Sequence, residues 1–286
     1  MAFAPSERYL PASNGHSGFS SALADGGVYQ DRQQPERGRK SLLVDMLLAP
    51  AELPWLLGSE VWRGKNIPHG DGSDVYVLPG FLGNDFYLGW MRNWLRRINY
   101  NPRALGVGLN TDPEHITLRL VEESRREYEL TGRKSHYVGH SLGGAIARAA
   151  SIVDPEPVAS INAFGSPIDG DFEQEVDPFV FWLAKQTISL LDGSDVSRQK
   201  MESLLQDPRE DIKVTYVQTV DDGVVHWKAT VDPCKGTKNV QISGSHIGLA
   251  WNPYLYQELA HSLHDAQEKI PKPEDKILRF PAGFAA

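Results

Sequence analysis

From Asp74 onward, short apolar runs alternate with segments of helical period, and this alternation constrains the possible folds more than any other feature of the chain. The apolar runs lie at 74–80, 103–109, 135–140, 158–166, 212–220 and 238–244. Strands separated by helices make right-handed crossovers, which build a parallel sheet with helices on both faces. The sequence therefore predicts an α/β fold with a mostly parallel sheet of about six strands.

Three stretches lie outside this alternation. Residues 1–38 are rich in Ser, Gly, Gln and charge and hold few aliphatic side chains, so we expect a flexible N-terminal arm. Residues 168–209 separate two predicted strands and contain an aromatic cluster and a second helical piece, which predicts a helical insert. Residues 270–286 form a Pro-containing tail. The predicted domain spans residues 39–269.

An apolar segment of near-helical spacing follows the arm, with Leu42, Leu43, Met46, Leu47 and Leu48. We expect Pro50 and Pro54 to break this run. Its polar positions are the acidic Asp45 and Glu52, whereas helices on membrane surfaces usually carry Lys or Arg there. The segment is therefore expected to pack against the body of the domain, with peripheral lipid contact as the alternative.

Composition argues against several classes of function. The chain has 29 Lys+Arg against 37 Asp+Glu, a net charge of −8, without the basic blocks that a nucleic-acid partner requires. Its single cysteine, Cys234, permits no internal disulfide and no Cys-rich metal site. The first residues lack the pattern of a secretory signal, and no run approaches the roughly 18 apolar residues of a spanning helix. We expect a cytoplasmic protein with no nucleic-acid partner, metal ion or transmembrane segment; its oligomeric state stays open.

A serine lies at the end of the third apolar run, where open parallel sheets carry their functional sites. The motif is Gly139-His140-Ser141-Leu142-Gly143, and a helical segment begins directly after the serine. Such a sharp strand-to-helix turn lifts the hydroxyl out of the sheet, and flanking glycines leave room for the turn. Ser141 is the predicted nucleophile. A Gly-rich packing turn without catalytic function is the alternative.

A serine hydroxyl is a poor nucleophile until a base takes its proton. The chain order nucleophile, acid, histidine predicts that both partners follow Ser141. His246, in the loop after the final predicted strand, is the expected base, with His226 as the alternative. His140 adjoins the nucleophile, and its side chain is expected to point away from the hydroxyl and to form a wall of the site.

The acid of such a site is expected after the strand at 212–220, where Asp221 and Asp222 follow. It would hold the histidine in one tautomer and stabilise its protonated form. Adjacent carboxylates point in different directions, so one of them can reach the histidine. Asp222, next to the glycine that turns the chain, is the predicted acid, and Asp221 is the alternative. A second alternative is that both are solvated loop acids without a catalytic role.

Acyl transfer also requires backbone donors for the oxyanion. One is the N–H of the residue after the nucleophile, here Leu142, and the other comes from the loop after an early strand. The turn Pro79-Gly80-Phe81-Leu82 supplies that loop, with the N–H of Phe81 as the predicted donor. Loss of one such donor typically costs about 10²–10³ in rate.

Together these residues resemble the α/β-hydrolase superfamily, and in particular bacterial esterase- and lipase-like serine hydrolases with a GHSLGG nucleophile elbow. The likeness runs from about residue 68 to 263 and covers PHGDGSDVYVLPGF (68–81), YVGHSLGGAIAR (137–148), FGSP (164–167), DDGVVHW (221–227) and GSHIGLAWNP (244–253). In such hydrolases the residues at the positions of Ser141, Asp222 and His246 are catalytic. The oxyanion turn reads PGF where many lipases have HGF, and two strands that open the standard sheet have no counterpart here.

The resemblance implies acyl-ester substrates, no cofactor, and a helical lid where residues 168–209 lie. Phe179, Phe181 and Trp182 in this insert are the predicted cover of an acyl chain; the alternative is that they pin the insert to the core. We therefore expect a carboxylic ester hydrolase of esterase or lipase type that acts on a small-molecule acyl ester. An acyltransferase or thioesterase with the same triad, and a non-catalytic binding module, are the alternatives.

Overall fold

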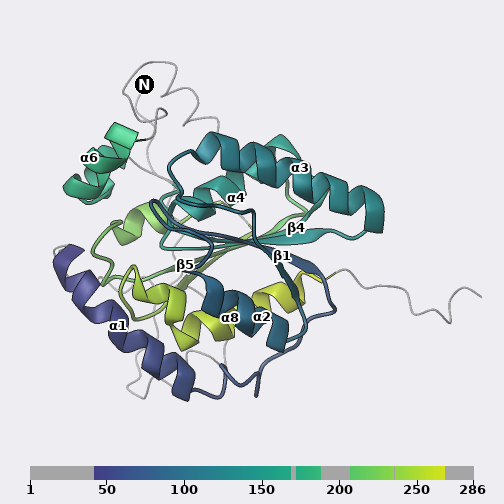
Figure 1. Cartoon of the computed structure of the whole chain (residues 1–286), viewed down its shortest axis with the longest axis horizontal. Helices are drawn as coiled ribbons and strands as arrows, with labels where there is room; N and C mark the ends of the chain where they lie inside the picture. Colours follow the sequence, from purple (N-terminus) through teal and green to yellow (C-terminus); the bar gives the residue numbers. More distant parts are fainter. Residues whose placement is uncertain (1–41, 169–171, 188–206, 235, 268–286) are drawn as a thin grey trace, which may run out of the picture.

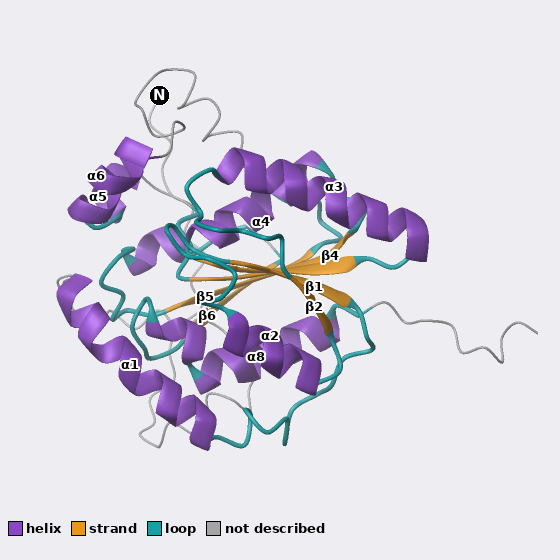
Figure 2. Ribbon diagram, viewed as in Figure 1, coloured by secondary structure: helices purple, strands orange, loops and turns teal. Residues whose placement is uncertain are grey.

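A computed structural model of the chain describes residues 42–168, 172–187, 207–234 and 236–267 (Figure 1). Its centre is a six-stranded sheet in which every strand pair is parallel, with helices on both faces (Figure 2). The predicted α/β fold is confirmed. The predicted arm and tail lie outside the described residues, as does much of the predicted insert. None of the described helices has the length and hydropathy needed to span a bilayer.

The strand order of the sheet has a switch point between two neighbouring strands. The strands are β1 (Asp74–Leu78), β2 (Asn101–Arg103), β3 (Ser135–His140), β4 (Val158–Phe164), β5 (Lys213–Gln218) and β6 (Thr237–Gln241). Their order is β2-β1-β3-β4-β5-β6, so the chain runs one way from β1 to β2 and the other way from β3 onward. The switch point between β1 and β3 is where open α/β sheets bind ligands, outside the carboxyl ends of the strands.

Two layers of helices enclose the sheet. The described helices are α1 (Leu42–Gly58), α2 (Gly89–Arg97), α3 (Pro113–Thr131), α4 (Leu142–Val153), α5 (Phe172–Glu175), α6 (Pro178–Thr187) and α8 (Pro253–Asp265), with 3-10 turns η2 (Trp227–Thr230) and η3 (Gly248–Trp251). Figure 1 shows α3 and α4 on one face and α1, α2 and α8 on the other.

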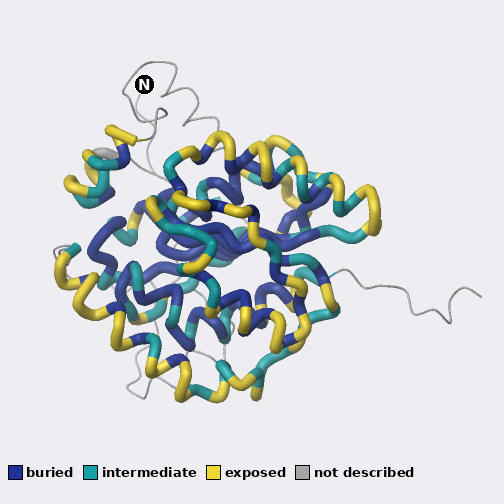
Figure 3. Tube along the Cα trace, viewed as in Figure 1, coloured by how far each residue is buried: buried dark blue, intermediate teal, exposed yellow. Residues whose placement is uncertain are grey.

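The pleat of the strands divides the core into two. Val75 and Val77 of β1 pack with Trp94 of α2 on one face, while Tyr76 and Leu78 belong to the core on the opposite face. These four side chains of β1 are all buried, as expected for a parallel sheet covered on both sides. Figure 3 shows the centre of the sheet as buried. The sheet is therefore a rigid platform for the loops at its carboxyl edge.

The prediction of a strand over 103–109 is wrong. The strand β2 is Asn101–Arg103, an edge strand in which Pro102 cannot donate a ladder hydrogen bond. The chain then leaves the sheet because Val107 bonds to Asp85 instead: its N–H donates to Asp85 Oδ2 (2.7 Å) and its carbonyl accepts from Asp85 N–H (3.2 Å). This loop therefore lies beside the turn that follows β1.

The expectation that Pro50 and Pro54 break the first helical run is also wrong. Helix α1 continues through both prolines. Both lie on its exposed side, where the carbonyl groups that lose an N–H partner can bond to water. The buried side of the helix packs against η3. Contacts of that side, described below, hold the helix on the domain.

Candidate active site

Ser141 occupies a strained turn between β3 and α4. Its backbone has φ 52° and ψ −124°, a region that residues other than glycine rarely adopt. The N–H of Ser141 donates to the carbonyl of Phe164 at the end of β4 (2.9 Å), which fixes the turn against the neighbouring strand. Strain of this kind persists only where the surrounding structure enforces it, and it is concentrated at functional sites.

The glycines around Ser141 are required by close backbone contacts. A Cβ on Gly139 would lie 2.4 Å from the carbonyl carbon of Gly143. A Cβ on Gly143 would lie 2.3 Å from the carbonyl oxygen of Leu78. The start of α4 therefore packs directly on the end of β1, which brings the turn after β1 beside the serine.

Asp222 and His246 form a buried pair after β5 and β6. Asp222 Oδ2 lies 2.7 Å from His246 Nδ1, and the two residues are 4% and 3% exposed. The second oxygen, Oδ1, accepts from the N–H groups of Val224 (2.8 Å) and Val225 (2.7 Å). The carboxylate is thus fixed on both sides. Because Nδ1 faces Asp222, Nε2 is the imidazole nitrogen available to another partner.

The environment of His246 favours its protonated form. Burial acts to lower the pKa of the imidazole, but the charge of Asp222, its hydrogen bond and the charge of Asp45 outweigh burial and raise the pKa above its usual value. A histidine in this setting accepts a proton readily.

Ser141 and His246 lie beside two consecutive residues at the end of β4. Phe164 accepts the hydrogen bond from Ser141, and a Cβ on the next residue, Gly165, would lie 3.0 Å from His246 Nδ1. In the described part of the chain no hydrogen bond joins the Ser141 hydroxyl to His246. Contacts between nucleophile and base are often long without substrate and shorten in the complex.

His140 supports the loop that carries His246. Its Nε2 lies 2.9 Å from the carbonyl oxygen of His246, and its ring stacks on Phe164 with centroids 5.0 Å apart. Burial, together with the charge of His246, lowers the pKa of His140 well below its usual value, so the ring is neutral and donates Nε2–H to that carbonyl. A contact of His140 with substrate stays a prediction.

The geometry does not favour the two alternative residues. His226 Nδ1 lies 3.0 Å from Glu175 Oε2 of α5, at an angle that does not make a hydrogen bond, and its N–H donates to the Glu175 carbonyl (2.7 Å). His226 thus faces the insert. Asp222, rather than Asp221, is the acid in contact with His246.

The turn after β1 lies next to the serine. A Cβ on Gly80 would be 3.0 Å from Ser141 Cβ, which brings the following residue, Phe81, to the edge of the site. Leu142, the second predicted oxyanion donor, is the first residue of α4, where backbone N–H groups have no partner within the helix. Both oxyanion assignments stay predictions.

Asn110 holds this turn. The sequence did not identify it as part of the site. Its Nδ2 donates to the Pro79 carbonyl (2.7 Å), its N–H donates to the Gly83 carbonyl (2.9 Å), and its carbonyl accepts from Leu82 N–H (3.1 Å). Asn110 is fully buried. A lone Asn after a Gly-rich apolar run was the available signal, but it indicates a loop and not a contact with another loop.

The described part of the insert packs beside the Asp222 loop. In α6, Phe181 packs with Val224 and Val225, while Phe179 and Trp182 are 59% and 55% exposed. The rings of Phe179 and Trp182 stack with centroids 6.2 Å apart. Phe181 thus fits the pinning interpretation, and the other two aromatic residues present an apolar surface.

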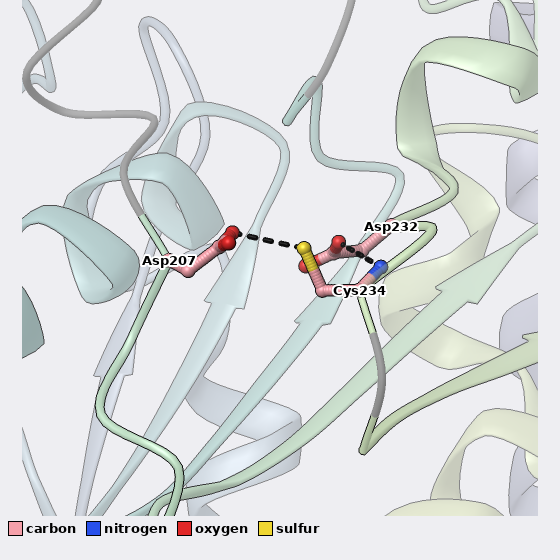
Figure 4. A group of neighbouring side chains, drawn as sticks. All are labelled: Asp207, Asp232 and Cys234. Carbon is pink, nitrogen blue, oxygen red and sulfur yellow. Dashed lines mark hydrogen bonds between the residues drawn. The ribbon is translucent and has the colours of Figure 1, made fainter. Parts of the chain in front are cut away.

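Asp207, Asp232 and Cys234 form a separate cluster, with ligand atoms within 4.8 Å of one another (Figure 4). Arg148 already pairs with both carboxylates, at 2.7 Å from Asp232 and 2.9 Å from Asp207. Burial and the two neighbouring carboxylates raise the pKa of the Cys234 thiol to about 12. The cluster therefore neutralises a buried guanidinium and does not suit a cation.

Comparison with known proteins defines the fold. No protein-family model and no curated protein match the chain. Its structure is similar to the mature lipase BlEst2 of Bacillus licheniformis, with a TM-score of 0.51 and 14% identity over 71% of this chain and 95% of that one. The fold is that of the α/β-hydrolases.

Two further solved structures are similar at lower scores. A monoacylglycerol lipase of Paleococcus ferrophilus has a TM-score of 0.48 and 13% identity, over 70% of this chain and 97% of that one. A carboxylesterase structure from Nitrososphaera gargenis has a TM-score of 0.48 and 16% identity, over 69% and 93%.

Proposed function

We propose that this protein is a serine hydrolase of esterase or lipase type, which cleaves carboxylic esters through Ser141, His246 and Asp222. The observation that carries the proposal is a serine at positive φ on a strand-to-helix turn, next to a buried Asp–His pair. The fold shared with the lipase BlEst2 supports an acyl ester as the substrate. The chemistry needs no cofactor.

In the first half of the reaction, Ser141 Oγ attacks the ester carbonyl while His246 Nε2 takes its proton. Asp222 holds Nδ1 and stabilises the imidazolium that forms. The imidazolium then gives its proton to the departing alkoxide, so the alcohol leaves and an acyl-enzyme stays on Ser141. The raised pKa of His246 fits a group that accepts and returns one proton in this step.

The negative charge that develops on the carbonyl oxygen is assigned to two backbone donors, the N–H groups of Leu142 and Phe81. The close approach of Gly80 to Ser141 supports this assignment because it brings the turn that carries Phe81 beside the serine. Water, activated by His246, then attacks the acyl-enzyme and releases the acid. Phe179 and Trp182 are proposed to cover an acyl chain during these steps.

The test is hydrolysis of p-nitrophenyl esters from acetate to palmitate by the wild type and by Ser141→Ala. We expect turnover by the wild type and none by the variant, with the optimum chain length separating esterase from lipase. Labelling by a fluorophosphonate at Ser141 reports the nucleophile independently. Labelling without ester turnover would direct attention to thioesters and acyl acceptors. The proposal would be overturned if the wild type showed neither labelling nor ester turnover.

A further inference from the structure

Helix α1 turns both of its acidic side chains toward the domain, while several of its apolar side chains face solvent. Asp45 and Glu52 are 0% and 8% exposed, whereas Leu43 and Leu47 are 67% and 71% exposed. A buried carboxylate is costly unless its oxygens accept hydrogen bonds. The partners of these two side chains therefore explain why the helix is oriented in this way.

Asp45 bonds to both loops of the candidate triad. Its Oδ2 accepts from the N–H of Gly223 (3.1 Å), next to Asp222, and from the N–H of His246 (2.5 Å). Its Oδ1 accepts from the N–H of Ile247 (3.0 Å). One side chain thus joins the loop after β5 to the loop after β6, at His246 and at the residue next to Asp222.

Glu52 fixes the same loop further along. Its Oε1 accepts from the N–H (2.7 Å) and the hydroxyl (3.0 Å) of Ser245, and its Oε2 accepts from Asn252 Nδ2 (2.7 Å). A Cβ on Gly248 would lie 2.1 Å from Oε1, so the loop closes tightly around the carboxylate. Burial raises the pKa of Glu52 despite these bonds. Glu52 therefore fixes the segment 245–252, and Asp45 holds this segment in place relative to the loop that carries Asp222.

We propose that Asp45 is a positioning residue, which holds the Asp222 loop and the His246 loop in the relative placement that the proton transfer requires. The inference rests on the proposed function, because the step that it serves is the transfer from Ser141 to His246. Misplacement of a catalytic group by about 1 Å can cost about 10²-fold in rate. A single carboxylate that bridges both loops prevents such misplacement without touching the substrate.

The charge of Asp45 also acts on His246. The titratable groups that face this imidazole are Asp222 from the loop after β5, His140 from β3 and Asp45 from α1. Tyr87 contacts the same loop, through its hydroxyl and the Ile247 carbonyl (2.8 Å). Removal of the Asp45 charge should therefore lower the pKa of His246, whereas a purely structural role would leave that pKa where it is.

The experiment compares Asp45→Asn with Asp232→Asn. The control also removes a buried carboxylate, since Asp232 is 3% exposed, but Asp232 pairs with Arg148 and, among the described residues, makes no hydrogen bond or ion pair with Asp222, Gly223 or His246. The readouts are the His246 pKa from histidine ¹H–¹⁵N NMR, and kcat and KM on a p-nitrophenyl ester. We expect Asp45→Asn to lower the His246 pKa and to lower kcat by about 10²-fold with KM little changed.

A His246 pKa and a kcat equal to those of the control would overturn the inference, and so would an effect confined to KM. If the wild type hydrolyses no ester, the proposed function fails, and the NMR readout alone decides: a lowered pKa supports the positioning contact and an unchanged pKa overturns it. If Asp45→Asn does not fold, Asp45→Ser, which keeps an acceptor oxygen without the amide donors, carries the same measurements.

Discussion

The imidazole Nε2 of His140 lies 2.9 Å from the carbonyl oxygen of His246, and the two rings are 4.8 Å apart between centroids. The residue before the proposed nucleophile therefore supports the residue proposed as its base. Positive charges on both rings would repel each other at this separation. The lowered pKa of His140 and the raised pKa of His246 avoid that state.

Replacing His140 by Leu should leave the His246 carbonyl without its donor and cost about 1–3 kcal/mol of stability. It should also lower kcat, because the loop that holds His246 loses a support. Urea unfolding and ester kinetics measure the two effects. The matched control is His136→Leu in the same strand, which loses a bond to Ser160 (2.8 Å) away from the site. Equal kcat in the two variants would contradict this account.

The activity should depend on pH through His246. A general base acts in its neutral form, so kcat/KM should fall as pH drops through the raised pKa of His246, above the usual value of about 6.5. Asp222→Asn removes the charge that raises this pKa. It should shift the acidic limb to lower pH and lower kcat by about 10⁴-fold, as loss of the acid does in serine triads. If the acidic limb of the pH profile stays at the same pH in Asp222→Asn, that limb reports the titration of a group other than His246.

Gly143→Ala should damage both stability and activity. The added Cβ would lie 2.3 Å from the Leu78 carbonyl oxygen, so α4 or the end of β1 must move. Overpacking of this kind costs about 1–3 kcal/mol. Gly89→Ala is the control, since no atom lies within 4 Å of its added Cβ. Thermal unfolding and ester turnover compare the two, and wild-type turnover in Gly143→Ala would show that the contact is not limiting.

Arg148→Met should destabilise the fold by about 3–5 kcal/mol, because it leaves the buried Asp232 carboxylate without its charge partner. Activity per folded molecule should stay near the wild-type value, since the acids that pair with Arg148, Asp207 and Asp232, are not members of the proposed triad. The control Arg126→Met removes a guanidinium that is 64% exposed and should change stability by less than about 0.5 kcal/mol. Chemical denaturation with active-site titration tests both; similar stabilities for the two variants would contradict the assigned role.

The aromatic residues of α6 make a prediction about chain length. Trp182 is exposed, so Trp182→Ser should reduce hydrolysis of long-chain esters more than that of acetate. Phe181 packs with Val224 and Val225, so Phe181→Ser should lower stability and reduce all chain lengths together. Kinetics on the p-nitrophenyl series separate the two patterns. An equal loss on every ester in Trp182→Ser would favour pinning over an acyl cover.

Local sequence signals indicated most of the sheet and the candidate site residues. Continuous apolar runs around Val75 and Val138 can only be buried between two helical layers, which determines a parallel sheet. The glycines on either side of Ser141 indicate a crowded turn, and chain order points to Asp222 and His246 as its partners. Each of these inferences depends on residues that lie next to one another in the chain.

Only the tertiary structure shows that a side chain of α1, Asp45, joins the loops after β5 and β6. The signal for α1 was present, since Asp45, Ala49, Glu52 and Leu56 follow helical spacing, yet the sequence cannot say whether an acidic stripe faces water or a set of backbone N–H groups. The partners of Asp45 are some 180 to 200 residues away in the chain. The same holds for β2, which ended early because Val107 bonded to Asp85.

The sequence by itself thus determined the α/β class, the turn at Ser141 and the identity of the acid and base candidates, because periodicity and turn chemistry are local. Only the tertiary structure decided the orientation of α1, the contact of Asp222 with His246 and the support from Asn110 and Asp45. Those depend on which backbone groups are left without partners once the sheet has formed. These contacts join residues that are far apart in the chain, so local sequence patterns do not predict them.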